Sequence, residues 1–305
     1  MKKLDEMKHL LEECRLCPRN CGANRLAGEK GACGAAAEVL VAKAFPHRWE
    51  EPCISGEKGS GTVFFTCCNM KCIFCQNYRI SQEGYGKAVS IDELSDIFLK
   101  LQQKGVHNIN LVTPTIYTPQ IIEAIKTAKS AGLCIPVVWN SNAYENVETI
   151  KALGGLVDVY LPDLKYFDDT LAFKYSFAPN YFQHATKAIL EMLSQVGEPV
   201  FDENGIIKRG LIIRHLVLPG HKEDSKKILH WISCHLPKGV YISLMSQYMP
   251  YYKAKSHPEI NRRLSAEEYH DVIEYFFEQG LENGFVQEEG AASEEYVPDF
   301  DLEGV

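Results

Sequence analysis

The chain has 305 residues, of which 46% are hydrophobic, and its formal net charge is −8. This length suffices for one large domain with a small appendage, and the acidic balance without a basic stripe argues against nucleic-acid binding. No apolar run reaches the length of a membrane span and the amino terminus lacks the apolar core of a signal peptide, so we expect a cytoplasmic protein without a membrane partner.

The first sixty residues hold five of the eleven cysteines. Because cytosolic thiols stay reduced, dense cysteines there indicate metal ligands rather than disulfides. Cys14, Cys17, Cys21 and Cys33 have the spacing C-x2-C-x3-C-x11-C, and nearby glycines allow the chain to fold tightly around a metal. Four thiolates predict a closed site for zinc or for an auxiliary iron–sulfur cluster, and unligated thiols are the alternative.

From residue 62 onward, short apolar runs alternate with amphipathic stretches. The apolar runs predict six buried strands, at 62–65, 108–112, 135–139, 157–161, 211–217 and 240–244. Capping signals and helical periodicity predict helices at 90–104, 118–132, 144–153, 223–235 and 265–280. Residues 198–210 contain a turn signal and predict a hairpin near the substrate mouth.

Six such β/α units indicate an α/β fold with a parallel sheet, either doubly wound or a partial (β/α)6 TIM-like barrel. In both folds the active site lies at the carboxyl ends of the strands. We expect a Cys-rich metal-binding module at 1–60, the barrel at 61–286 and an acidic carboxyl-terminal tail at 287–305.

Directly after the first of these strands, Cys68, Cys72 and Cys75 form a C-x3-C-x2-C motif. Three thiolates on one loop can hold three irons of a [4Fe–4S] cluster and leave the fourth iron open for substrate chemistry. A zinc loop with a borrowed fourth ligand, or three buried thiols, would be the alternatives.

The motif CNMKCIFCQN resembles the cluster loop of the radical S-adenosylmethionine (SAM) superfamily. Together with CRLCPRNCG, YLPDLKYF, IRHLVLPG and YVPDF, it is similar to the PflX-type branch of proteins related to pyruvate formate-lyase activating enzyme. The resemblance selects the partial barrel. It implies that a reduced [4Fe–4S] cluster cleaves SAM to methionine and a 5′-deoxyadenosyl radical, which abstracts a hydrogen atom.

Polar residues follow two further strands, and the resemblance implies roles for them. Thr113 and Thr115 lie where backbone groups of the superfamily meet the SAM amino group, although a helix-entry turn also favours these residues. Asn140 and Asn142 lie where the activating enzymes approach the SAM ribose. We therefore expect all four residues to contact SAM.

Charged residues accompany the next two strands. Asp163 and Lys165 match a segment in which the Lys meets the SAM carboxylate, and an ion pair between the two residues is the alternative. Arg214 interrupts an apolar strand, so it should face the barrel interior and pair with the SAM carboxylate or with a barrel carboxylate such as Asp163.

We therefore interpret the chain as a radical SAM oxidoreductase that takes hydrogen from a protein or peptide, as glycyl-radical activating enzymes do, with a reductant such as flavodoxin or ferredoxin. A radical SAM reaction on a small metabolite is one alternative. A non-enzymatic iron–sulfur redox protein is the other, but it would need no SAM-contacting strand ends.

Overall fold

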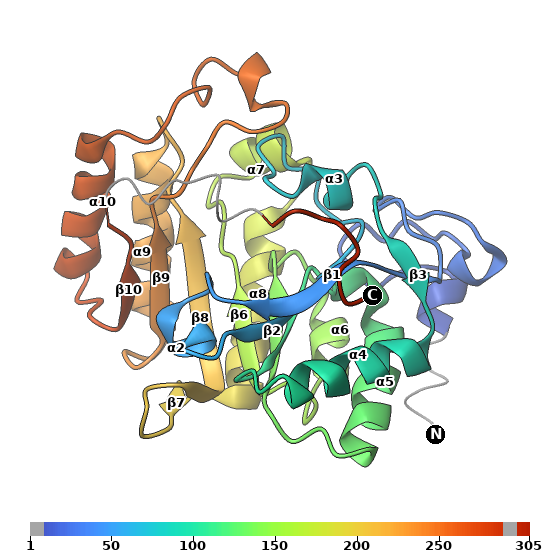
Figure 1. Ribbon diagram of the computed structural model, residues 1–305. Coiled ribbons are helices and arrows are strands. Elements are labelled where there is room, and N and C mark those ends of the chain that lie inside the picture. The colour runs from blue at the N-terminus through green and yellow to red at the C-terminus, as the bar shows by residue number, and fades with distance from the viewer. Residues whose placement is uncertain (1–8, 289–297) are drawn as a thin grey trace.

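The structure is a computed structural model that describes residues 9–288 and 298–305 (Figure 1). Its strands form one sheet in the order β10-β9-β8-β6-β5-β4-β2-β1-β3. Their bounds are β1 Val39–His47, β2 Ser60–Phe65, β3 Lys87–Val89, β4 Ile109–Val112, β5 Val137–Ser141, β6 Val159–Pro162, β8 Ile207–Leu216, β9 Tyr241–Met245 and β10 Gly284–Val286. The run from β2 to β10 is parallel, whereas β1 pairs antiparallel with both β2 and β3.

The sheet is a partial barrel, as the sequence predicts. Its end strands β3 and β10 do not pair with each other within residues 9–288 and 298–305, so the barrel is open there. The six predicted strands correspond to β2, β4, β5, β6, β8 and β9. Their identification succeeds because each is a short apolar run buried on both faces.

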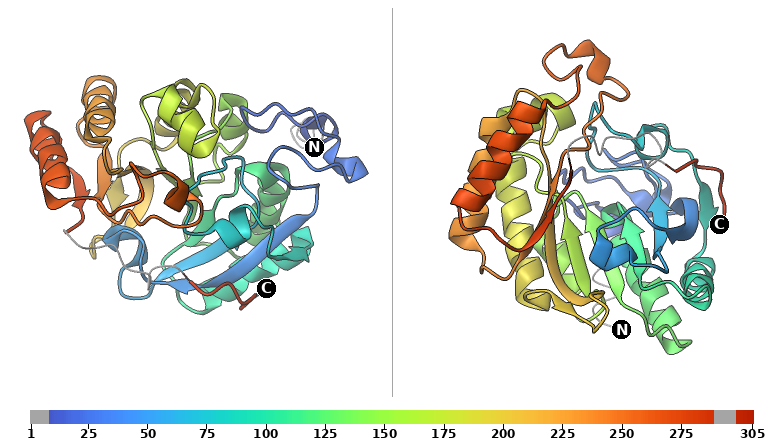
Figure 2. Two further views of the ribbon diagram at one scale, coloured as in Figure 1. Left: turned by 90° about the horizontal axis from the view of Figure 1, so that it is seen from above. Right: turned by 60° about the vertical axis from the view of Figure 1, so that its left-hand side comes forward.

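Helices cover the outer face of the sheet, as Figures 1 and 2 show. They are α4 Ile91–Gln103, α5 Thr118–Ser130, α6 Val147–Ala152, α7 Asp169–Ser176, α8 Tyr181–Val196, α9 Lys222–His235 and α10 Ala266–Glu278. The capping box predicted for α4 is present, since the Ser90 hydroxyl accepts from the Glu93 amide and the Glu93 carboxylate accepts from the Ser90 amide. A large apolar core lies between these helices and the sheet. None of the helices in the described part of the chain is long and apolar enough to cross a membrane.

The inner face of the sheet is covered by the connection between β1 and β2. This connection contains the short helix α2, Pro52–Ser55, which lies in front of β6 and β8 in Figure 1. Cys53 and Ile54 pack there against Val138 of β5, against Val159 and Leu161 of β6, and against Ile212 of β8. This second apolar cluster fixes α2 against the inner face of the sheet.

Two segments cross the domain boundaries that the sequence predicts at residues 60 and 287. Strand β1 falls within residues 1–60 of the sequence, but it joins the main sheet through β2. In the tail, residues 289–297 lie outside the described residues, whereas the last residues run along β1. The Leu302 amide donates to the Ala42 carbonyl, and the Ala44 amide donates to the Glu303 carbonyl.

The predicted hairpin at 198–210 is present, but its expected location is wrong. Strand β7, Val200–Phe201, pairs antiparallel with Ile207 and Arg209 at the amino end of β8. The substrate mouth of a parallel barrel lies at the carboxyl ends of the strands. The hairpin therefore lies at the opposite end of the barrel from the candidate site.

Candidate active site

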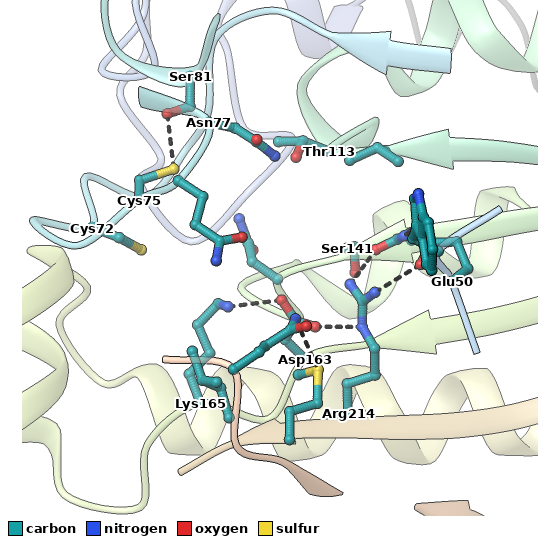
Figure 3. Close-up of a pocket in the computed structure, with 18 of the residues that line it drawn as sticks. Glu50, Cys72, Cys75, Asn77, Ser81, Thr113, Ser141, Asp163, Lys165 and Arg214 are labelled. Carbon is teal, nitrogen blue, oxygen red and sulfur yellow. Dashed lines mark hydrogen bonds and ion pairs between the residues drawn. The ribbon is translucent and has the colours of Figure 1, made fainter. Parts of the chain in front are cut away.

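A network of buried charges lies at the carboxyl ends of β6 and β8. Asp163 accepts from Lys165 Nζ at 2.7 Å through Oδ2 and from Arg214 Nε at 2.7 Å through Oδ1. Figure 3 shows Asp163 between the two cations. Arg214 also donates through Nη1 to Glu50 Oε2 at 3.1 Å and through Nη2 to Asn140 Oδ1 at 2.5 Å. The ion-pair alternative for Lys165 is thus present in the structure.

The mutual attraction in this network outweighs the cost of burial. Burial favours neutral Asp163, but Arg214 and Lys165 nevertheless lower the pKa of its carboxyl group. Burial also disfavours the charge of Lys165, yet attraction to Asp163 raises the pKa of the ammonium. All three groups are therefore ionised, and they are fixed before any ligand binds.

The predicted cluster cysteines lie together above this network. Cys68, Cys72 and Cys75 all line one cavity of about 340 Å³, together with Asp163 and Lys165. Each sulfur has a polar neighbour. Cys68 Sγ accepts from Asn142 Nδ2 at 3.4 Å, Cys72 Sγ accepts from Ser176 Oγ at 3.0 Å, and Cys75 Sγ lies 3.3 Å from Ser81 Oγ.

The chemistry of these thiols fits an iron–sulfur cluster. Burial and the neighbouring thiols raise the pKa of Cys68 to about 12 and that of Cys75 to about 11. Thiolates in such a place require a strongly cationic partner, which a cluster supplies. In the described residues no three His, Cys, Asp or Glu side chains converge as the ligands of a single metal ion do. Cluster ligands stand farther apart because each binds a different iron.

Of the four polar residues expected after β4 and β5, three line the cavity: Thr113, Asn140 and Asn142. Thr113 has φ +59°, a left-handed conformation that is strained for a β-branched residue, and its amide donates to the Asn140 carbonyl at 2.9 Å. Strain of this kind is found at sites where the surrounding structure fixes the backbone for function.

The expectation for Thr115 differs from the structure. Thr115 is buried outside the cavity, and its hydroxyl donates to Glu145 Oε1 at 2.8 Å. Glu145 also accepts from Trp139 Nε1 at 2.9 Å and from Ser141 Oγ at 2.6 Å. A buried carboxylate must be satisfied by such donors, so Thr115 holds the strand-end loops together behind the cavity.

The four amino-terminal cysteines also gather in one place. Burial and the neighbouring Cys33 and Cys14 raise the pKa of Cys17, and burial and the neighbouring Cys21 raise the pKa of Cys14. Gly31 lies between two of the sulfurs, since a Cβ there would be 3.1 Å from Cys21 Sγ and 3.5 Å from Cys33 Sγ. The absence of a side chain at Gly31 keeps the space between Cys21 and Cys33 open, although the four thiols do not converge as the ligands of a single metal ion do.

This amino-terminal cysteine site contacts the cluster loop directly. Arg19 Nε donates to the Asn69 carbonyl at 2.8 Å, and Lys71 Nζ donates to the Cys33 carbonyl at 3.2 Å. Asn69 in turn accepts from Asn142 Nδ2 at 2.8 Å. The two cysteine sites are therefore joined by hydrogen bonds through the loop that carries Cys68 and Cys72.

Sequence reasoning missed the acidic pair Glu50–Glu51, which also lines the cavity. Both side chains are enclosed by the protein, and Figure 3 shows Glu50 on the far side of the pocket from Cys72 and Cys75. A signal was present in the sequence, because two adjacent acids come shortly after β1, which ends at His47. The interpretation of residues 1–60 as a separate module concealed it.

Further cavity residues come from the end of β9 and the loop after it: Ser243, Met245, Gln247, Tyr248 and Met249. Tyr248 lies beside Phe74 of the cluster loop, with their ring centroids 5.6 Å apart, and its hydroxyl donates to the Ile260 carbonyl. These side chains form the wall opposite β4 and β5.

The site combines a three-cysteine loop with a charged network at the strand ends of an open α/β barrel. This combination is that of a cofactor-dependent radical enzyme. The chain belongs to the radical SAM superfamily, whose family model matches residues 62–232. Members of this superfamily use SAM and a [4Fe–4S] cluster, so the chain is a radical SAM enzyme. An uncharacterized protein of Methanocaldococcus jannaschii is 35% identical over 280 residues, which are 89% of this chain and 76% of that protein.

Two solved structures have a similar arrangement. A domain of pyruvate-formate lyase-activating enzyme from Bacteroides vulgatus is 18% identical, with a TM-score of 0.41, over 57% of this chain and 94% of that one. SuiB of Streptococcus suis, bound to S-adenosylmethionine, is 16% identical with a TM-score of 0.48. That alignment covers 73% of this chain and 48% of SuiB.

Proposed function

We propose that this protein cleaves SAM reductively at a [4Fe–4S] cluster held by Cys68, Cys72 and Cys75, and abstracts hydrogen from a protein or peptide, as glycyl-radical activating enzymes do. The observation that supports this most is that one cavity is lined by these cysteines, by Lys165 and by the polar strand ends. When bound, the cluster and SAM supply the electron and the hydrogen-abstracting group.

The residues of the chain bind and orient SAM in this proposal. Lys165 offers its ammonium to the SAM carboxylate, while Asp163 remains paired with Arg214. Asn140 and Asn142 offer amides to the ribose hydroxyls, and the fixed backbone at Thr113 meets the amino group. Arg214 acts as a positioning residue because it holds Asp163 and Asn140 in place.

The apolar side chains around the cysteines exclude water. Phe74, Met70 and Tyr248 line the cavity and are all buried. A radical reaction requires such an enclosure because solvent and adventitious hydrogen donors would consume the radical. This arrangement therefore favours an enzyme over an electron carrier.

The amino-terminal cysteines, we propose, hold a second metal centre that is distinct from SAM cleavage, either zinc or an auxiliary iron–sulfur cluster. Gly31 supports this because it leaves space between Cys21 and Cys33. Electrons for the SAM-binding cluster would come from a low-potential carrier such as flavodoxin or ferredoxin. The reducing cytoplasm is the proposed location, since all eleven cysteines are free.

Anaerobic incubation with dithionite and SAM tests the proposal. We expect reconstituted protein to form 5′-deoxyadenosine and methionine, and Cys68→Ala/Cys72→Ala/Cys75→Ala to form neither and to lose the reduced-state EPR signal that responds to SAM. The matched control replaces the exposed Cys134 and Cys234 with Ala and should behave as wild type. A fully loaded wild-type cluster that cleaves no SAM with candidate substrates present would favour the redox-protein alternative.

Deuterium transfer identifies the substrate class. Candidate partner proteins labelled with deuterated glycine should pass deuterium into 5′-deoxyadenosine. Transfer from a labelled small metabolite, and none from proteins or peptides, would support the metabolite alternative. Metal analysis of the triple-Ala variant should find zinc, or iron and sulfide, at the amino-terminal site, and finding neither would leave those four cysteines unligated.

A further inference from the structure

The floor of the cavity has two adjacent carboxylates with different surroundings. Glu50 is fully paired, because it accepts from Asn110 Nδ2 at 3.0 Å and from Arg214 Nη1 at 3.1 Å. Glu51 is only 8% exposed and also lines the cavity, yet its Oε2 has no hydrogen-bond partner among the described residues. A buried acceptor without a partner is costly, so it requires a reason.

Glu51 Oε2 differs from the other buried polar atoms without a partner because its residue lines the cavity. The other buried side-chain atoms without partners in the described part of the chain belong to Arg19, Asn110, Tyr117 and Gln120, and none of these residues lines the cavity. Burial and the neighbouring Glu50 raise the pKa of Glu51, although Arg214 and the Ser243 hydroxyl act in the opposite direction. One oxygen of a constrained carboxylate thus remains available at the cavity floor.

The charges around the cavity are unequal. Glu50, Glu51 and Asp163 face two cations, Arg214 and Lys165. Lys165 pairs with Asp163, and Arg214 pairs with Asp163 and Glu50. Burial raises the pKa of Glu51, so a cationic group beside it would stabilise its charged form.

A second cavity adjoins the first one next to Glu51 and is lined by Glu50 and Pro52 on either side of it in the sequence. Its volume is about 450 Å³, and it shares Trp49, Glu50, Pro52, Gln247 and Gln287 with the first cavity. Trp49 is 62% exposed, so a large aromatic surface stands at the shared boundary. Arg48, which also lines the second cavity, is exposed, whereas Glu51 is buried.

We propose that Glu51 binds an ammonium or guanidinium group of the substrate, which enters through the second cavity past Trp49. The inference rests on the proposed function, since it names the substrate chemistry of that same site. A carboxylate that receives a charge-assisted hydrogen bond in a water-poor site discriminates strongly against a neutral isostere. The cationic group could come from a Lys or Arg side chain of a peptide or from a free amine.

Calorimetry on the cluster-loaded protein with SAM can test this. The probes are N-acetyl-lysine amide and its neutral isostere N-acetyl-norleucine amide, each also placed within a pentapeptide of glycines. We expect wild type to bind the lysine probes about tenfold or more tightly than the norleucine probes, because a charged hydrogen bond has about this strength. Glu51→Gln should bring the two affinities together. Tighter binding of the lysine pentapeptide would identify a peptide source, and tighter binding of the single amino acid a free amine.

The matched control is Glu57→Gln, which removes an exposed carboxylate beyond α2 and should keep the wild-type preference. Equal binding of both probes by wild type, binding of neither at millimolar concentration, or an unchanged preference in Glu51→Gln would each overturn the inference. A lower melting temperature of Glu51→Gln with unchanged preference would make Glu51 a counterion of Arg214 only. A loss of SAM affinity without a change in preference would assign Glu51 to SAM instead.

Failure of the proposed function can be distinguished from failure of the cationic subsite. Wild-type protein that prefers the lysine probes but cleaves no SAM would refute SAM cleavage and leave the cationic subsite in place. Protein that cleaves SAM but shows no preference would do the reverse.

Discussion

Lys165 and Arg214 both bind Asp163, yet their replacement by Met should have different consequences. Arg214 connects Asp163 and Glu50, so Arg214→Met leaves two buried carboxylates with fewer partners. Breaking a buried ion pair by removal of one partner costs about 3–5 kcal/mol. Lys165 bonds to Asp163 alone, and Asp163 keeps Arg214 after Lys165→Met, so that loss should be about 1.5–3 kcal/mol at most.

For SAM affinity we expect the reverse: Lys165→Met should have the larger effect and Arg214→Met the smaller one. If Lys165 meets the SAM carboxylate, Lys165→Met removes a charge-assisted hydrogen bond and weakens SAM binding about tenfold or more. Arg214→Met should change SAM affinity per folded molecule less, because its contacts are to Asp163, Glu50 and Asn140. Urea unfolding of the cluster-free proteins and SAM binding to the reconstituted proteins measure the two effects.

Lys151→Met is the matched control, since within residues 9–288 and 298–305 Lys151 pairs only with Glu148 on the exposed surface of α6. It should alter neither measurement. The reasoning is refuted if Lys165→Met binds SAM as wild type does, or if Arg214→Met unfolds at the wild-type urea concentration.

Two further predictions concern the amino-terminal site and the barrel core. Gly31→Val places a side chain between Cys21 and Cys33, so it should remove the metal that remains in the Cys68→Ala/Cys72→Ala/Cys75→Ala background, and retention of the full metal content would contradict the proposed site. Burial lowers the pKa of His215 to about 4, and its ring bonds to the Leu164 carbonyl and Ser225 Oγ. Because unfolded His titrates near 6.5, stability should be fully present above about pH 7 and should fall by up to about 1.4 kcal/mol per pH unit as pH drops toward 4. Urea unfolding of cluster-free wild type and His215→Gln between these pH values should show the shallower slope in the variant, and equal slopes would exclude this origin.

The sequence alone determined the parallel strands from β2 to β9, the helices α4, α5, α6, α9 and α10, and the position of the cysteine loop, but it predicted no range for α7 or α8. These features depend on local patterns: an apolar run such as 157–161, a capping box such as Ser90 with Glu93, and the spacing of three cysteines. It also indicated that Asp163, Lys165 and Arg214 face one place, because the carboxyl ends of parallel strands meet at the same end of a sheet.

Tertiary structure decided which of these side chains meet and which turn away. Thr115 and Thr113 are two residues apart, but a left-handed turn at Thr113 directs Thr115 to the buried Glu145. Glu50 and Glu51 come from a connection that crosses the inner face of the sheet, and no local pattern encodes that crossing. Contacts between segments more than 100 residues apart, such as Glu50 with Arg214, depend on strand order and on the packing of α2, and these arise only when the whole chain folds.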